Sequence, residues 1–264
     1  MKDKISRWTT NEIMRLKQAY PSYRFGDLKD LFSQRTLSGI RTKAVRLKIK
    51  KPFKDLKFIN LEPSFSLGYT IGVVFGDGNL SSWKERNGAE HFYVRLKAKD
   101  KDFVEFFEKH INLIGGHCTT FFDKRGFYNA TVHSKSLHIF LKNFPTTEAL
   151  KMSKDMKRGF LMGIFDSEGT ITKRKNCNGH QIKIINKNEQ LIDVCKRLLE
   201  EFGIKANKYK VGGSSFNPNG TYYNLYIKAE SLTNFFVNLG FSIKRKQDRL
   251  LELMKFIEGG YYSH

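Results

Sequence analysis

The sequence has few cysteines, no long apolar run and too few acidic residues to balance its basic ones. Cys118, Cys177 and Cys195 form an odd set without CxxC spacing, which argues against a zinc site or a disulfide framework, so we expect all three to be structural. The longest apolar run, Leu67 to Phe75, is too short to span a bilayer. The first ten residues carry charges without an apolar core, unlike a secretory signal. We therefore expect a soluble protein that is not secreted.

Motifs of two other protein classes are also missing, whereas positive charge is in excess. No glycine-rich GK[ST] loop is present, which excludes an ordinary P-loop motor. The seven histidines follow neither an HNH arrangement nor the spacing of metal ligands. The chain has 47 Lys and Arg against 26 Asp and Glu, a net charge of +21. This charge favours a polyanionic partner, with nucleic acid ahead of an anionic membrane surface.

Residues 6 to 50 predict three short helices. Thr9 with Glu12 three residues later forms a capping box, so the first helix starts there and runs to Pro21. Leu28, Leu31 and Phe32 have the spacing of a second helix. A third helix starts near Ser38; its expected inward residues are Ile40, Ala44, Val45 and Leu47, and its outward residues are Arg41, Lys43, Arg46 and Lys48.

This pattern, with the strings Trp8-Thr9, Tyr20-Pro21 and Ile40 to Leu47, resembles a Myb/SANT-like helix-turn-helix module. The resemblance covers the first fifth of the chain and implies that the third helix contacts DNA through Arg41, Lys43 and Arg46. A three-helix cap with a solvated basic face is the alternative. Basic residues around Pro52 then predict a linker. The expected division is a helical domain over residues 1–52 and a linker over 53–63.

From about residue 64 the chain repeats itself. Residues 67–78, LGYTIGVVFGDG, are echoed by residues 158–169, RGFLMGIFDSEG, with Asp77 and Glu168 at corresponding places 91 residues apart. Each motif is followed by the same order of periodic patterns: two strands, a helix, two strands and a helix. We therefore expect an α+β fold of two pseudo-symmetric αββαββα half-domains, residues 64–150 and 151–264, plus the small all-α N-terminal domain.

Each repeated motif predicts a short helix that ends at an acid. Small residues line one side of both helices: Gly68, Gly72 and Gly76 in one, Gly159 and Gly163 in the other. Because small side chains let helices approach backbone to backbone, we expect the two to pack side by side and to bring Asp77 and Glu168 together. Gly78 and Gly169 are expected in the left-handed conformation that ends a helix. The two carboxylates would repel without a divalent cation, which predicts Mg²⁺, or Mn²⁺, with oxygen ligands.

The doubled motif resembles the LAGLIDADG signature of homing endonucleases, over residues 64 to 255. By that family's pattern, Asp77 and Glu168 are the catalytic acids that bind metal, with the carbonyls of Gly76 and Ser167 as further ligands. The family implies a staggered cut of double-stranded DNA within a long, tolerantly read site. A single chain would then act as a monomer with internal pseudo-twofold symmetry. Phe75 departs from the pattern where Asp166 keeps an acid, and we expect Asp166 to be structural.

Two expected strand faces form a DNA-binding saddle. Alternate residues of each strand point away from the core, and here they are mostly polar or basic. The expected DNA contacts of the two halves are Tyr93, Arg95, Lys97, Lys99, Thr170, Thr172, Arg174, Gln181, Lys183, Tyr222, Asn224, Tyr226 and Lys228. For any single one of these residues, a solvated strand face is the alternative.

Two lysines are candidates for a role beside the metal. In the LAGLIDADG family, a lysine or glutamine near each metal orients water or balances charge. Lys97 stands where the first is expected, and residues 241–246 resemble the segment that carries the second, which makes Lys244 its candidate. Plain phosphate contacts are the alternative for both lysines.

The main hypothesis is a site-specific, metal-dependent homing endonuclease, located in the cytoplasm or in the organelle that holds its target DNA. An intron RNA-binding maturase and a DNA-binding transcription regulator on the same scaffold are the alternatives, so intron RNA stays open as a partner. Neither alternative requires both acids, and this chain keeps Asp77 and Glu168.

Overall fold

The computed structural model describes residues 7–23, 25–49, 59–86, 88–173, 180–212 and 220–258. The chain divides into two compact units, Met1–Phe58 and Ile59–His264, and each has a hydrophobic core of its own. Arg174 and Cys177 lie outside the described residues. Among the described residues, no helix is both long enough and apolar enough to cross a membrane.

The first unit consists of three helices, α1 (Thr10–Ser22), α2 (Phe25–Leu31) and α3 (Leu37–Arg46). The predicted capping box is present: the side chain of Thr9 accepts from the backbone N–H of Glu12, and the Glu12 carboxylate accepts from the backbone N–H of Thr9. Arg35, between α2 and α3, makes a 2.8 Å ion pair with Glu12 in the first turn of α1. The core of the unit is formed by Leu16, Tyr20, Leu28, Phe32, Ile40 and Ala44.

The inward face of α3 is narrower than the sequence predicts. Ile40 and Ala44 are buried, but Val45, which we expected inside, is 72% exposed. Each residue turns the helix by about 100°, so Val45 follows Ala44 away from the core of the unit. Arg41 and Arg46 are exposed as predicted, whereas Lys43 is half-buried.

The second unit contains the predicted order of helices and strands twice. The first half comprises α4 (Phe65–Gly76), β1 (Gly78–Lys84), β2 (Glu90–Ala98), α5 (Lys101–Leu113), β3 (Cys118–Phe122), β4 (Tyr128–His133) and α6 (Lys135–Asn143). The 3-10 helix η1 (Thr146–Lys151) leads to the second half: α7 (Lys154–Glu168), β5 (Gly169–Lys173), β6 (His180–Asn186), α8 (Glu189–Glu201), β7 (Ala206–Val211), β8 (Tyr222–Ile227), η2 (Ala229–Ser231) and α9 (Leu232–Asn238). The helix α10 (Lys244–Glu258), which the sequence did not predict, follows.

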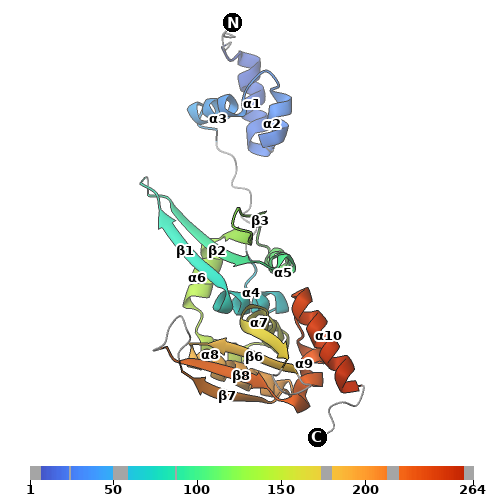
Figure 1. Ribbon diagram of the computed structural model, residues 1–264. Coiled ribbons are helices and arrows are strands. Elements are labelled where there is room, and N and C mark those ends of the chain that lie inside the picture. The colour runs from blue at the N-terminus through green and yellow to red at the C-terminus, as the bar shows by residue number, and fades with distance from the viewer. Residues whose placement is uncertain are drawn as a thin grey trace. The chain divides into compact units, whose positions relative to one another are not determined.

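Two four-stranded antiparallel sheets have the same strand order, β1-β2-β4-β3 and β5-β6-β8-β7. Residues of one strand face, among them Val94 and Leu96 in the first half and Ile182 and Ile184 in the second, are buried under the helices. The α+β fold of two pseudo-symmetric halves is therefore confirmed. Figure 1 shows α4 and α7 side by side between the two sheets.

The helices α4 and α7 approach each other backbone to backbone at the predicted glycines. A methyl group added at Gly72 would lie 2.2 Å from the carbonyl oxygen of Phe160, and one at Gly68 would lie 2.0 Å from that of Met156. From the other helix, a methyl group at Gly163 would lie 2.5 Å from the carbonyl oxygen of Tyr69. No side chain fits at these positions, so the helix pair depends on glycine.

The glycines that follow the two acids are required for a reason other than the one predicted. Neither has a positive φ; Gly169 has φ −75°, and both begin strands. A side chain at Gly78 would instead lie 2.4 Å from the Cα of Val74, and one at Gly169 would lie 2.2 Å from the carbonyl oxygen of Phe165. Tight passage of the chain from helix to strand therefore requires glycine here.

Cys118 and Cys195 are free and buried in the two halves, in keeping with structural roles. Burial raises the pKa of the Cys118 thiol to about 12.

Replacing Gly72 with alanine tests the close packing of α4 against α7. Alanine stabilises an isolated helix more than glycine does, so a loss of stability would report the clash with the backbone of α7 at Phe160 and Gly163. We expect the free energy of unfolding of Gly72→Ala to fall by about 2–3 kcal/mol in chemical denaturation. Gly212→Ala is the matched control: an added methyl group meets nothing within 4 Å there, and stability should change by less than about 0.5 kcal/mol. Equal stability of the two variants would disprove the packing argument.

Candidate active site

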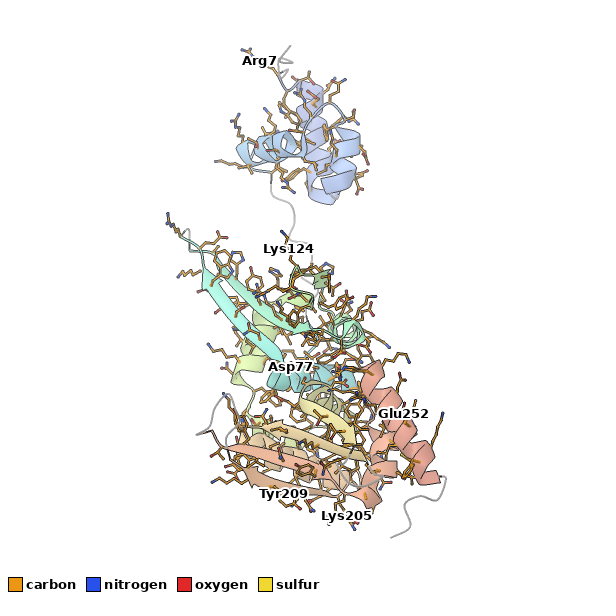
Figure 2. All side chains as sticks on the ribbon, in the orientation of Figure 1. Arg7, Asp77, Lys124, Lys205, Tyr209 and Glu252 are labelled. Atoms are coloured by element: carbon orange, nitrogen blue, oxygen red, sulfur yellow. The ribbon has the colours of Figure 1, made fainter. Side chains whose placement is uncertain are left out.

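Asp77 and Glu168 end the two central helices and lie at the same end of the helix pair. Asp77 caps α4, and Glu168 is the last residue of α7. A methyl group added at Gly76 would lie 2.3 Å from the Cβ of Ser167 and 3.4 Å from the Cγ of Glu168, so the two helix ends are in contact. Figure 2 labels Asp77 at the end of α4, between the two sheets. The structure thus brings the two predicted acids together.

Burial disfavours the ionised form of both carboxyl groups, and the charge of Asp77 adds to this effect at Glu168. Burial and the charge of Asp77 raise the pKa of Glu168 to about 7, and burial raises the pKa of Asp77 above its ordinary value. Asn186, the last residue of β6, donates its side-chain N–H to Glu168 Oε1 at 3.0 Å and partly offsets this effect. The helix pair therefore holds together two carboxylates that a cation would stabilise.

Lys246 on α10 is the lysine beside this pair of acids. Its side chain is 5% exposed and donates to the carbonyl oxygens of Phe165 at 3.2 Å and of Asp166, in the last turn of α7. Burial lowers the pKa of Lys246 to about 8, although the nearby carboxylates of Asp166 and Asp77 favour its charged form. A cation is favourable at the carbonyl end of a helix, so Lys246 stabilises the turn that presents Glu168.

Asp166 is buried in a hydrogen-bond network that joins three elements. Its carboxylate accepts from the hydroxyl of Tyr69 at 2.9 Å, from the backbone N–H of Ser242 at 2.9 Å and from the Ser242 hydroxyl at 2.6 Å. Burial raises the pKa of Asp166 to about 6 despite these donors. The expected structural role of Asp166 fits this geometry, because its carboxylate is occupied by α4 and by the segment before α10.

The corresponding position of the first half has no such network. Phe75 packs instead against Phe144 and Phe160, with ring centroids 6.1 Å away in both cases. The polar anchor of the second helix is therefore replaced by aromatic packing in the first.

The start of α10 is also tied to the first half. Arg245 makes a bidentate ion pair with Asp100, at 2.7 and 2.8 Å, and the backbone N–H of Lys244 donates to Asp102 at 2.5 Å. The side chain of Lys244 is exposed and pairs with Asp248 at 2.9 Å. Lys246, and not the predicted Lys244, is thus the lysine of this segment that lies beside the acids; three consecutive basic residues left the choice open in the sequence.

Lys97 lies on β2 near Asp77 but forms its ion pair with Asp123. It follows Leu96, whose partner on β1 is Gly78, the residue after Asp77. Its ammonium group contacts Asp123 at 2.5 Å and lies 4.7 Å from the ring centroid of Phe127. This pair holds the pKa of Asp123 well below its usual range. A direct contact of Lys97 with Asp77 is not present in the described structure.

The polar faces of both sheets carry the residues predicted to contact DNA. On the first sheet these are Tyr93, Arg95 and Lys97, with Lys99 just beyond β2. On the second they are Thr170, Thr172, Gln181, Lys183, Tyr222, Asn224, Tyr226 and Lys228. The sequence analysis missed Asn207 and Tyr209 of β7, which pair with Tyr226 and Asn224 of β8 and therefore share this face. Arg41, Lys43 and Arg46 belong to the first unit.

The two acids suit a hard divalent cation that keeps other oxygen ligands. Among the described residues, no cluster of three His, Cys, Asp or Glu forms around them. Any further ligands would therefore be the backbone carbonyls of Gly76 and Ser167, water and the oxygens of a substrate. Mg²⁺ binds in this way, through one or two carboxylates with waters and phosphate oxygens. The residues present thus fit the predicted Mg²⁺ or Mn²⁺.

Comparisons with known proteins agree with this fold. Residues 155–240 match the family described as a LAGLIDADG-like domain. The uncharacterised protein MJ0398 of Methanocaldococcus jannaschii is 32% identical over 221 residues, which cover 78% of both chains. A DNA polymerase of Thermococcus litoralis is 26% identical over 221 residues, only 12% of its length. The homing endonuclease I-DmoI, in complex with DNA and Ca, shares the fold with a TM-score of 0.53, at 19% identity over 72% of this chain and 97% of that one.

Replacing Glu168 with glutamine tests the cost of ionising a buried acid beside Asp77. The pKa of Glu168 is about 7 in the folded protein against an ordinary 4.5, so ionisation destabilises the metal-free protein above pH 7 and has no effect below about pH 4.5. Glu168→Gln should therefore raise the free energy of unfolding at pH 8 by up to about 3 kcal/mol, and the gain should vanish near pH 4.5. Thermal unfolding in EDTA across this pH range measures it. Glu252→Gln, at an exposed carboxylate, is the control; a gain for Glu168→Gln that does not depend on pH would contradict the prediction.

Proposed function

The chain belongs to the same family as MJ0398 and contains a LAGLIDADG-like domain, and from this we propose that it is a site-specific, divalent-metal-dependent endonuclease that cuts double-stranded DNA. The observation that carries the proposal is the placement of Asp77 and Glu168. They come from two pseudo-symmetric halves, the ends of their helices are in contact, and Asp77 lies between the two sheets. One acid per half suits one phosphodiester bond in each strand of a duplex.

The bound metal would activate water and stabilise the oxygens of an in-line displacement at phosphorus. Asp77 and Glu168 would hold it, with the carbonyls of Gly76 and Ser167. Asn186 orients the carboxylate of Glu168 through its 3.0 Å hydrogen bond. Lys246 keeps the last turn of α7 in place and contributes positive charge to the site, a role that we assign to it in place of Lys244.

Positive charge and the sheet faces support DNA as the substrate. A net charge of +21 favours phosphate contacts, and these contribute most of the sequence-independent affinity for a duplex. Lys183 and Lys228 are polar-face residues suited to such contacts, and Lys97 could join them when DNA competes with Asp123. We propose that the protein acts as a monomer, in the compartment that holds its target DNA.

The match to 12% of a DNA polymerase also supports homing. A chain that resembles a short segment inside an enzyme of another activity is what an inserted endonuclease would produce. Homing endonucleases resemble this chain in fold, and a mobile element needs a cut in the uninterrupted copy of its host gene. The DNA that flanks the reading frame is therefore the first target to test.

Removing either acid should stop cleavage without stopping binding. We expect Asp77→Asn and Glu168→Gln each to reduce the cleavage rate of a plasmid with the uninterrupted insertion site by at least about a hundredfold in Mg²⁺. Electrophoretic mobility-shift assays in EDTA should show an affinity for DNA that is unchanged or higher, because a carboxylate without bound metal repels phosphate. Mg²⁺ should raise the melting temperature of the natural protein at pH 8, and neither variant should show that rise. Full cleavage by one variant would remove its acid from the mechanism.

The first unit should extend the DNA footprint. We propose that α3 contacts DNA through its basic outer residues, among them Arg41, Lys43 and Arg46, as a helix-turn-helix reading would place them. Deleting residues 1–52 should then weaken binding by about tenfold or more and shorten the region protected from nuclease digestion, while single-turnover cleavage stays intact. An unaltered footprint would contradict a DNA-binding role of this unit.

A further inference from the structure

Strand register allows the polar faces of the two sheets to be compared residue by residue. Arg95 of β2 and Lys183 of β6 each pair with the second residue of the preceding strand, so they hold the same place in the two halves. Two residues earlier on the same strands and on the same face stand Tyr93 and Gln181. The two halves have the same backbone at this place but different side chains.

In the first half, the place that Tyr93 holds is filled by packed side chains. Tyr93 is only 9% exposed, and its hydroxyl accepts from the indole N–H of Trp83 at 3.1 Å. The ring of His133 lies 4.3 Å from that of Tyr93, and the guanidinium carbon of Arg95 lies 4.4 Å from the same ring. Arg95 is exposed, and its guanidinium group lies over an aromatic ring that is itself buried and hydrogen-bonded. The polar face of the first sheet therefore presents the guanidinium group of Arg95 in a defined position, and this group can only donate hydrogen bonds.

In the second half, the equivalent place, held by Gln181, borders an open recess. A recess of about 330 Å³ lies over β6, β7 and β8 and is lined by Gln181, Asn207, Tyr209, Tyr226, Lys228 and Glu230, among others. Tyr209, labelled in Figure 2, and Tyr226 form one wall, with ring centroids 5.7 Å apart. The Tyr209 hydroxyl accepts from the side-chain N–H of Asn207 at 3.3 Å, and Glu230 pairs with Lys205 at 3.2 Å. The recess is far larger than a single water molecule requires.

The side chains on the polar faces of the two halves have hydrogen-bonding groups that suit different bases. A primary amide has both a donor and an acceptor, and adenine offers an acceptor at N7 and a donor at N6 in the major groove. Guanine offers two acceptors there, N7 and O6, which suit the paired donors of an arginine. Gln181 and Asn207 therefore fit adenine, whereas Arg95 fits guanine.

We propose that the recess over β6, β7 and β8 reads an adenine through Gln181 and Asn207, while the closed place in the first half reads a guanine through Arg95. The inference rests on the proposed function, since it names the DNA that the two sheets would recognise. It makes the target asymmetric although the scaffold is pseudo-symmetric. Lys228 at the recess contributes the positive charge that a neighbouring phosphate requires.

Selection from a randomised duplex library tests the inference. The full chain with Asp77→Asn and Glu168→Gln is used in EDTA, so that bound DNA is recovered uncut. We expect an enriched site with adenine at one position of one half and guanine at one position of the other. Each preferred base should exceed the alternatives by roughly tenfold in affinity.

Two reciprocal variants assign each preference to its residue. Gln181→Glu keeps the shape but removes the N–H donor, so the adenine preference should be lost or replaced by cytosine, which offers only a donor. The guanine preference should stay. Arg95→Ala should abolish the guanine preference alone. Gln190→Glu on α8 adds the same charge away from the recess and should change neither preference.

Replacing the selected adenine with 7-deazaadenine removes only its N7 acceptor. The protein that keeps Gln181 should bind the substituted duplex about tenfold more weakly than the selected one. Gln181→Ala should bind both duplexes equally, and its thermal stability shows whether it is folded. An enriched site whose base preferences are the same in Gln181→Glu and Arg95→Ala as in the unsubstituted protein would overturn the inference and leave the nuclease proposal intact. Failure to enrich any site would instead count against DNA recognition by the sheets, and with it against the proposed function itself.

Discussion

At the middle of the second unit the backbones of α4 and α7 touch through glycines, and this contact decides where the functional groups lie. Met156, Phe160 and Tyr69 contribute backbone carbonyls to an interface that leaves no room for side chains. Because the two helices end beside each other, the packing of the helices makes neighbours of Asp77, which caps α4, and Glu168, which ends α7. Each helix continues directly into a strand, so the same constraint also sets the positions of the two sheets.

Bringing two carboxylates together has an electrostatic cost. The interactions that offset this cost differ between the end of α7 and the end of α4. Near the end of α7, Lys246 and the hydrogen bonds of Asp166 connect the helix to α10, and Arg245 connects α10 to Asp100 of the first half. Near the end of α4, Phe75 packs among aromatic rings instead. The C-terminal helix therefore joins both halves to the central pair and supplies the buried cation that the acids lack.

The repeated motif made the centre of the molecule predictable, whereas its surroundings were not. Glycine spacing and two acids followed from the chain itself, as did the order of strands and helices. Lys246 and Asn186 were missed because tertiary packing selects them: three adjacent basic residues have equal claims until α10 buries one. Val45 was misplaced for a similar reason, since a ten-residue helix with a small partner buries only a narrow stripe.

Duplication of a half explains the shared backbone, and divergence of side chains explains what each half can do. Strand register keeps Tyr93 and Gln181 in equivalent places, so either can change without moving a strand. A packed tyrosine stiffens the first face, while an amide beside a recess leaves the second open. Since the placement of the acids depends on helix packing and the character of the faces on strand side chains, the face residues can vary while the pair of acids keeps its geometry. For the endonuclease that we propose, this separation would allow an asymmetric target to be read on a pseudo-symmetric fold.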